Sequence, residues 1–152
     1  IPLKIAFPHL EICLVDSLNK RIGFLNEVIE KLNLDYIEAI HARAEELARQ
    51  KEYREVFDLC TSRAVANLSS LSEYCLPFVK QNGYFISMKG ALADKEIENA
   101  TNALKTLSGK IEEKYNFNLC DAGERNIIKI KKISQIPTKY PRVSAQIAKK
   151  PL

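Results

Sequence analysis

The chain of 152 residues is 46% hydrophobic and 28% charged, and it contains five glycines and six prolines. That length and composition suit one domain with a sizeable core and exclude a disordered or low-complexity chain; no apolar run approaches the roughly 20 residues that a membrane span needs. The net charge of +4 is unevenly spread, because all 19 acidic residues precede position 125 while the last 28 residues carry eight Lys or Arg.

Short apolar strands alternate with amphipathic helices along most of the chain, which is typical of βαβ units and a mostly parallel sheet. Strands are predicted at 10–15, 36–41, 56–62, 84–89, 110–119 and 125–133. Helices are predicted at 2–7, after Ser17 up to 32, and at 44–51, 68–78 and 94–107. We therefore expect an α/β domain over 1–133.

The last predicted strand differs from the others. Residues 125–133 alternate between isoleucine and lysine, which favours an antiparallel strand with one face in water. Residues 134–152 hold three prolines and are predicted to form an extended basic tail. Such a tail suits a polyanion, because each neutralised phosphate releases counterions, and a solvated, solubilising tail explains the charge equally well.

An open α/β sheet binds its ligands at the carboxyl ends of its strands. Asp16 ends the first predicted strand. Its carboxylate can accept hydrogen bonds from both hydroxyls of a ribose, although Asp16 and Ser17 also suit a helix N-cap. Just past the second strand, Glu45 or the backbone of Ala44 can reach an adenine amino group. The alternative for Glu45 is a first-turn acid that the helix dipole favours.

Two cations also end predicted strands. Arg63 follows an apolar strand and precedes Ala-Val-Ala, so it is a single charge in an apolar setting, where arginine is rarely buried without a partner. A ligand contact and a structural ion pair both explain it. Lys89 ends the next strand, immediately before Gly90.

Several kinds of site are missing from the sequence. The four cysteines form no Cys-x-x-Cys pair and there are two histidines, so zinc-ligand spacing is absent and the thiols are interpreted as reduced and mostly buried. Neither a Ser/His/Asp or Cys/His arrangement nor a Walker loop is present. The chain starts at Ile1 without a Met, a signal pattern or the glycine-rich turn of a nucleotide-binding sheet. We expect that turn and a first strand just upstream.

Six runs carry a resemblance: Ile-Pro-Leu-Lys-Ile at 1–5, Leu-Val-Asp-Ser-Leu-Asn-Lys-Arg at 14–21, Arg-Ala-Glu-Glu at 43–46, Ser-Arg-Ala-Val-Ala at 62–66, Met-Lys-Gly at 88–90 and Lys-Tyr-Pro-Arg at 139–142. In order and at compatible spacing, they resemble the bacterial 16S rRNA guanine-N7 methyltransferase G family, also known as glucose-inhibited division protein B. The similarity covers the whole chain.

The resemblance implies a Rossmann-like, S-adenosylmethionine-dependent methyltransferase fold whose C-terminal strand is antiparallel, in a cytoplasmic, monomeric enzyme that uses no metal and no membrane. It implies methylation of N7 of one guanine in 16S rRNA. The cofactor contacts carried over are Ala44 and Glu45 near the adenine and Arg63 near the reacting end, and the strand-end argument adds Asp16. Family members carry a Gly-x-Gly-x-Gly-Phe-Pro-Gly loop just before the segment that matches Ile1, and this loop is not in the sequence.

The implied chemistry needs alignment more than proton transfer. Guanine N7 offers an exposed lone pair to an activated methyl group, so we expect no catalytic acid or base and expect Arg63 to position cofactor or base. Lys139, Arg142 and Lys89 are expected to hold phosphates of 16S rRNA or of the small ribosomal subunit. Alternatives are a methyltransferase with another substrate, a non-catalytic RNA-binding module of the same fold and, least favoured, a dehydrogenase.

Overall fold

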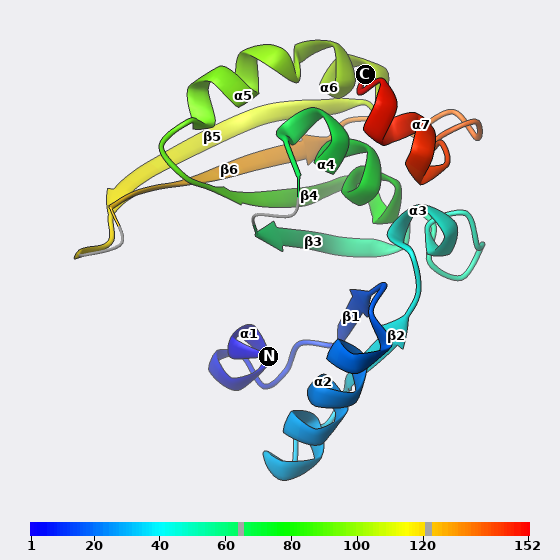
Figure 1. Cartoon of the computed structure of the whole chain (residues 1–152), viewed down its shortest axis with the longest axis vertical. Helices are drawn as coiled ribbons and strands as arrows, with labels where there is room; N and C mark the ends of the chain where they lie inside the picture. The colour runs from blue at the N-terminus through cyan, green and yellow to red at the C-terminus, as the bar shows by residue number, and fades with distance from the viewer. Residues whose placement is uncertain (64–65, 121–122) are drawn as a thin grey trace. The chain divides into compact units, whose positions relative to one another are not determined.

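The computed structural model describes residues 1–63, 66–120 and 123–152. The chain divides into two compact units, Ile1–Glu46 and Leu47–Leu152. Each unit contains its own hydrogen-bonded sheet, of two strands in the first and four in the second (Figure 1). No helix within the described ranges is both long and apolar enough to cross a membrane.

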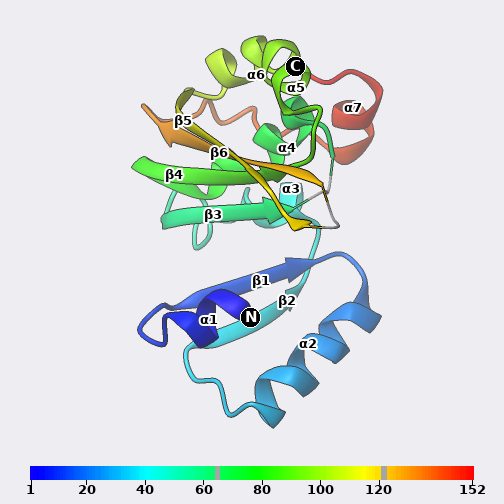
Figure 2. The same cartoon turned by 90° about the vertical axis from the view of Figure 1, so that its left-hand side faces the viewer.

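The first unit is a βαβ arrangement preceded by a short helix, α1 (Pro2–Ala6). Its strands β1 (Ile12–Asp16) and β2 (Ile37–His41) pair in parallel, with Asp16 opposite His41 at their carboxyl ends. Helix α2 (Asn19–Lys31) makes the crossover that parallel pairing requires (Figure 2). The short helix α3 (Ala44–Leu47) follows β2, so the predicted helix at 44–51 ends earlier than expected.

The second unit is a four-stranded sheet in the order β3-β4-β6-β5. Its strands are β3 (Phe57–Arg63), β4 (Val79–Lys89), β5 (Gly109–Asn118) and β6 (Glu124–Lys132). Strands β3 and β4 are parallel, and β6 runs antiparallel to both β4 and β5. The predicted antiparallel strand near the C-terminus is therefore confirmed.

One face of this sheet packs against helices (Figure 1). They are α4 (Leu68–Cys75), the 3₁₀ turn η1 (Leu76–Phe78), α5 (Ala93–Asn99) and α6 (Thr101–Thr106). Alternate residues of β6 point into the core, so Ile128 and Ile130 are fully buried beside Leu68, Leu71 and Leu107. Burial of each such side chain stabilises the fold by roughly 1.5–3 kcal/mol.

Among the other element boundaries that differ from the predictions are two in the second unit. The helix predicted at 94–107 is two helices that meet at Ala100, which caps both of them. Strand β4 begins at Val79, which pairs with Phe57, so Gly83 lies inside the strand instead of opening it. A Cβ on Gly83 would stand 2.6 Å from the carbonyl oxygen of Asp58, so glycine is required by the close approach of another backbone.

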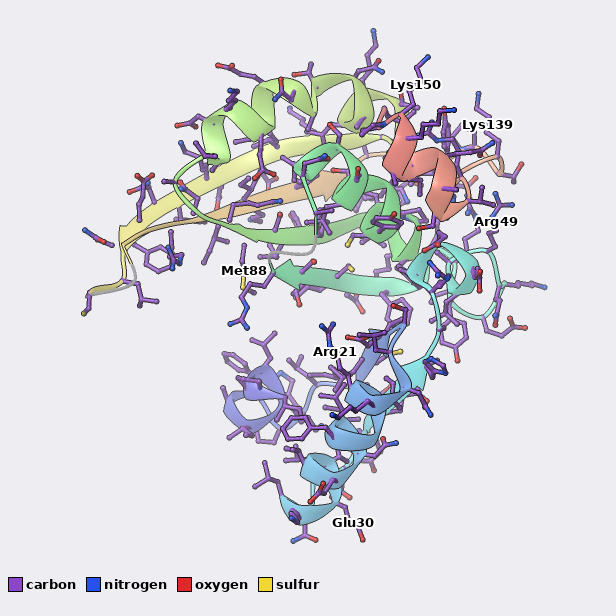
Figure 3. All side chains as sticks on the ribbon, viewed as in Figure 1. Arg21, Glu30, Arg49, Met88, Lys139 and Lys150 are labelled. Carbon is purple, nitrogen blue, oxygen red and sulfur yellow. The ribbon has the colours of Figure 1, made fainter. Side chains whose placement is uncertain are left out.

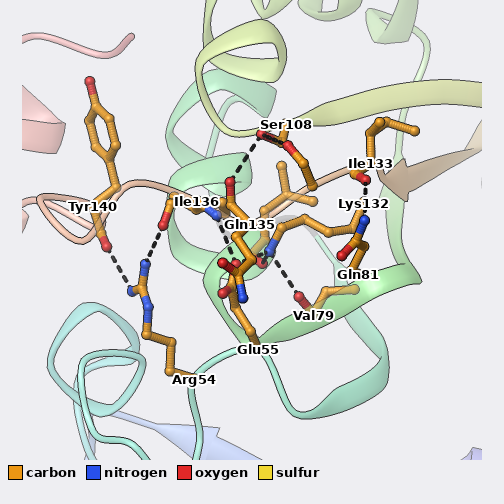
Figure 4. Close-up of polar contacts among 12 residues, drawn as sticks. Arg54, Glu55, Val79, Gln81, Ser108, Lys132, Ile133, Gln135, Ile136 and Tyr140 are labelled. Carbon is orange, nitrogen blue, oxygen red and sulfur yellow. Dashed lines mark hydrogen bonds and ion pairs between the residues drawn. The ribbon is translucent and has the colours of Figure 1, made fainter.

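The segment after β6 is not extended throughout, because Ser144–Lys149 form helix α7. Its first part is held by polar contacts (Figure 4). Arg54 donates to the carbonyl oxygens of Tyr140 at 2.8 Å and of Ile136 at 3.0 Å, and Glu55 accepts from the Ile136 amide at 2.9 Å. Tyr140 and Ile136 are buried in the same core as the sheet.

Candidate functional site

Asp16 lies where the sequence predicted it, at the carboxyl end of β1. One oxygen of its carboxylate accepts from the Leu18 amide at 2.8 Å, and the other pairs with Arg21 at 3.1 Å. Burial works against ionisation, but the hydrogen bonds from Leu18 and Arg21 together lower the pKa of Asp16. The side chain is 23% exposed and that of Arg21 is 67% exposed, so the partner of one carboxylate oxygen is a solvent-exposed surface side chain.

The alternative that Asp16 is the N-cap of the following helix is wrong. The N-cap of α2 is Leu18, and no side chain caps it. Asp16 instead accepts from the amide of the residue before the helix, an Asx-type contact that shapes the strand-to-helix turn. Its carboxylate therefore stays ionised at the sheet edge, which is the state a ribose diol requires of an acceptor.

Ala44 and Glu45 stand at the same edge of the first unit. The Ala42 amide donates to the Asp16 carbonyl oxygen at 3.1 Å, so the chain turns into α3 directly beside the end of β1. The Glu45 side chain is 7% exposed, and its ion pair with Arg43 is long, at 3.8 Å. A buried carboxylate with one distant cation has accepting capacity left for an N–H donor.

Arg63 is the last residue of β3, paired across the ladder with Met88 of β4. The residue is exposed, and no hydrogen bond or ion pair of its guanidinium is found among the described residues. The structural ion pair considered for Arg63 is thus not found in that part of the chain. Ala64 and Val65, which follow Arg63 in the apolar run noted in the sequence, lie outside the described residues.

Lys89 ends β4 but points to the helix-covered face. Its side chain is 4% exposed, and its ammonium group contacts Glu96 at 2.7 Å and the Ala66 carbonyl oxygen at 2.5 Å. Glu96 in turn accepts from the Leu68 amide at 2.8 Å, at the start of α4. Lys89 therefore links β4, α4 and α5, and a phosphate contact by Lys89 stays a prediction that requires this pair to open.

Arg142 has a structural partner that the sequence did not suggest. Its guanidinium forms a two-pronged pair with Glu73, with contacts of 2.9 Å and 2.7 Å, and its amide donates to the same carboxylate at 2.8 Å. The Glu73 side chain is fully buried. The hydrogen bond with Glu73 raises the pKa of Arg142. This pair fixes the C-terminal segment to α4.

Lys139 is different from Arg142 although it lies three residues away. It is exposed, and its ammonium group stands 5.2 Å from the centre of the Tyr140 ring. Figure 3 shows Lys139 and Lys150 directed away from the body of the second unit. Within the described ranges no carboxylate pairs with Lys139, so its charge is available to an external anion.

The described residues include no cluster of three or more potential metal ligands. None of the four cysteines, all of which lie in the described ranges, forms a disulfide. Only Cys75 is buried outright, while Cys120 is exposed, so the expectation of mostly buried thiols is wrong for the latter.

Two ion-paired carboxylates, the buried Glu73 and the partly buried Glu55, escaped the sequence interpretation. Glu73 lies in a helix whose other buried residues are small or apolar, and Glu55 bonds the fully buried Lys132 at 2.7 Å. A lone acid within such a helix is a usable signal for an interior ion pair. Its partner, 69 residues away, could not have been identified without the tertiary structure.

Comparison with known proteins decides the family. Residues 1–128 match the profile of the family described as "GidB: rRNA small subunit methyltransferase G". The chain belongs to this family. It is 54% identical over 153 aligned positions to the ribosomal RNA small subunit methyltransferase G of Lachnoclostridium phytofermentans and 52% identical to that of Bacillus licheniformis. The match covers all of this chain but spans 63% and 64% of those relatives' lengths.

Solved structures support the fold that the family implies. This chain is similar to TYW2 of M. jannaschii in complex with AdoMet, which is 16% identical at a TM-score of 0.65 over 89% of this chain and 63% of that one. A 16S rRNA (adenine(1408)-N(1))-methyltransferase from Catenulisporales acidiphilia, solved with SAM, is 10% identical at a TM-score of 0.69 over 90% and 80%. The predicted α/β, Rossmann-like methyltransferase fold is confirmed.

Proposed function

We propose that this chain is part of an S-adenosylmethionine-dependent methyltransferase that methylates N7 of a guanine in 16S rRNA. The observation that carries the proposal is the family match over residues 1–128. The acid at the end of β1 and the half-satisfied acid in α3 support it, because both fit an adenosine group. A cytoplasmic location and a monomeric state stay predictions of the sequence.

The residues of the first unit fit the adenosine end of the cofactor. Asp16 would accept from the ribose hydroxyls through the oxygen that now pairs with Arg21, whose exposed side chain has solvent to move into. Glu45 and the backbone of Ala44 would take the adenine amino group. When bound, the cofactor supplies an activated methyl group, and these contacts orient it without taking part in bond making.

Arg63 is proposed to position the reacting end or the guanine. Its guanidinium lacks a carboxylate partner among the described residues, and it ends a strand at the ligand-binding edge of the sheet. Guanine N7 carries its own lone pair, so no side chain has to remove a proton before attack. A fixed planar cation would orient its partner by paired hydrogen bonds, a role that lysine fills poorly.

Of the predicted RNA contacts, the structure favours Lys139 over Arg142 and Lys89. The ammonium group of Lys139 is exposed and unpaired within the described part of the chain, whereas the other two cations neutralise Glu73 and Glu96. Replacing Arg142 would therefore change folding and RNA binding together. Lys139 alone gives a clean test of the phosphate contact.

The proposal is tested by cofactor binding and methyl transfer. Calorimetry with S-adenosylmethionine would use these 152 residues and a chain extended to the relatives' full length, with Asp16→Asn against Lys31→Gln, a surface control on the same unit. Asp16→Asn should weaken binding about tenfold or more and Lys31→Gln should not. Equal binding by both variants would remove Asp16 from the site.

Methyl transfer then separates the alternatives. Acceptors would be naked 16S rRNA, small ribosomal subunits and a protein mixture, with product nucleosides analysed for methylated guanine. We expect transfer to rRNA or the particle, and at least tenfold less with Arg63→Lys. Transfer to protein alone would favour a different substrate, and the absence of cofactor binding by the extended chain would favour a non-catalytic RNA-binding module.

A further inference from the structure

The four-stranded sheet has one face that no helix among the described residues of its own unit covers. Directly paired residues on neighbouring strands share a face. The ladder pairs Arg63 with Met88, Met88 with Ile127, and Ile127 with Tyr115, so these four side chains form one row across the sheet. The row lies on the face opposite buried Ile128, near the carboxyl ends of β3 and β4.

The β5–β6 hairpin extends this row past the strand ends. Phe117 is paired with Arg125 on the same face, next to Tyr115 and Ile127. In Figure 1 the end of β5 and the start of β6 reach beyond the tip of β3. The rings of Tyr115 and Phe117 are exposed, at 54% and 41% respectively, which is unusual for two aromatic side chains so close together.

The cations of this surface differ from other cations of the sheet. Lys129 is paired with Glu112 at 3.0 Å, and Lys114 is paired with Asp94. Arg63 and Arg125 have no carboxylate partner within the described ranges, and Arg125 donates instead to the Glu124 carbonyl oxygen at 2.8 Å. Arg125 thus lies beside the exposed Phe117 ring, and Arg63 stands at the other end of the row from Tyr115, on the same face.

That pattern fits single-stranded nucleic acid. Unpaired bases stack on exposed aromatic rings, and arginine holds the phosphates between them. An apolar protein segment would leave the two guanidinium charges without a counterpart, whereas every nucleotide of an RNA strand brings a phosphate. Two opposing charges are present, Glu112 and Glu113, and they lie 3.0 Å and 3.7 Å from the ammonium group of Lys129, which offsets part of their repulsion of phosphate. Glu113 also accepts from the Tyr115 hydroxyl.

We propose that Tyr115, Phe117, Arg125 and Arg63 form a docking surface for the single-stranded RNA that adjoins the methylated base. The two rings stack on flanking bases, and Arg125 holds a backbone phosphate. Arg63, the last residue of β3, stands at the opposite end of the row from Tyr115. This inference rests on the proposed function, which supplies RNA as the substrate class. The surface lies outside the residues predicted from the sequence, apart from Arg63.

The first test measures binding of a fluorescent single-stranded RNA of about ten nucleotides by anisotropy. Tyr115→Ala and Phe117→Ala should each raise Kd roughly 5- to 100-fold, because each removes a stacking platform. Tyr115→Phe keeps the ring and should bind nearly as the parent chain does. Arg125→Gln should lower the slope of log affinity against log salt by about one, and Arg125→Lys should largely preserve it. Leu59→Ala, an exposed apolar change on β3 whose ladder partner is Tyr84, is the matched control and should change nothing.

The second test repeats the variants in the chain extended to the relatives' length and adds methyl transfer, cofactor calorimetry and melting temperature. We expect a higher KM for RNA with unchanged cofactor affinity and melting temperature for Tyr115→Ala and Phe117→Ala. Unchanged RNA affinity together with a lowered melting temperature would overturn the proposal, since a protein segment would then cover the rings. RNA binding that needs the rings but yields no methylated guanine would refute the proposed function and leave the surface standing. Methylated guanine formed by variants whose RNA binding does not depend on the rings would support the proposed function and refute the docking surface.

Discussion

Two basic regions of the second unit use their positive charge in opposite ways. The sequence predicted that the segment after β6 binds RNA, yet Arg142 in this segment forms an ion pair with the buried Glu73. The β5–β6 hairpin has a mixed charge pattern, yet Arg125 on it has no carboxylate partner among the described residues. The comparison teaches that the pairing of a cation, rather than the local density of cations, decides whether a phosphate can reach it.

The same contrast appears within the C-terminal segment. Residues 136–142 are fixed through their backbone by Arg54 and Glu55, and through Arg142 to α4. Lys139, between these anchors, is left exposed. A rigid segment with one projecting cation is a better phosphate contact than a flexible tail, because less conformational entropy is lost on binding.

The largest expected effect comes from breaking the Arg142–Glu73 pair. Arg142→Ala leaves a fully buried carboxylate without its partner and should lower the free energy of unfolding by about 3–5 kcal/mol, measured by urea denaturation. The double variant Arg142→Ala with Glu73→Gln should recover part of that loss, because no buried charge remains. A loss below about 1 kcal/mol for the single variant would mean that the pair is not structural.

The second effect concerns the polar clamp around Glu55. Burial lowers the pKa of Lys132, and the Glu55 carboxylate opposes that shift. Glu55→Gln should cost about 1.5–3 kcal/mol at neutral pH, because Lys132 and the Ile136 amide lose a charged acceptor. The charged lysine is penalised below its folded pKa, so the loss should shrink as the pH rises through that pKa. A loss that is constant from neutral to alkaline pH would contradict this account.

A smaller effect is expected for Lys139. Lys139→Ala should change the free energy of unfolding by less than about 0.5 kcal/mol, since the side chain is exposed. It should weaken RNA binding uniformly and reduce the salt slope by about one, measured by anisotropy over a range of KCl concentrations. Lys105→Ala, an exposed lysine in the last turn of α6, is the control. If the two variants show the same slope of log affinity against log salt, Lys139 does not contact a phosphate and its charge serves only solubility.

The smallest effect concerns the pH response of Asp16. Hydrogen bonds from Leu18 and Arg21 lower its pKa, so its contribution to stability is present above the unfolded pKa and is lost as the pH falls through the folded pKa. An NMR titration of the carboxyl carbon should give a midpoint below 3.8, the ordinary value. Arg21→Gln should move that midpoint upward. A midpoint that does not respond to Arg21→Gln would leave the Leu18 amide as the cause.

Much of the fold could be predicted because local pattern and tertiary position agree. The apolar run that ends at Asp16 and the Ile/Lys alternation of β6 gave strands of the right kind and nearly the right length. The start of β4 was missed because Gly83 looked like a strand opening, whereas it accommodates the backbone of Asp58 from another strand. Helix α7 was missed because the flanking prolines obscured a short helical segment.

By itself, the sequence determined the family, the order of strands and helices, and the acidic residue at the end of β1. These features depend on residue identity and on spacing along the chain, which are local properties. Only the tertiary structure decided which cations are free, because the partners of Arg142 and Lys132 come from positions 69 and 77 residues away. The role of a cationic residue depends on whether folding places a carboxylate beside it, as at Arg142, or leaves it exposed, as at Lys139.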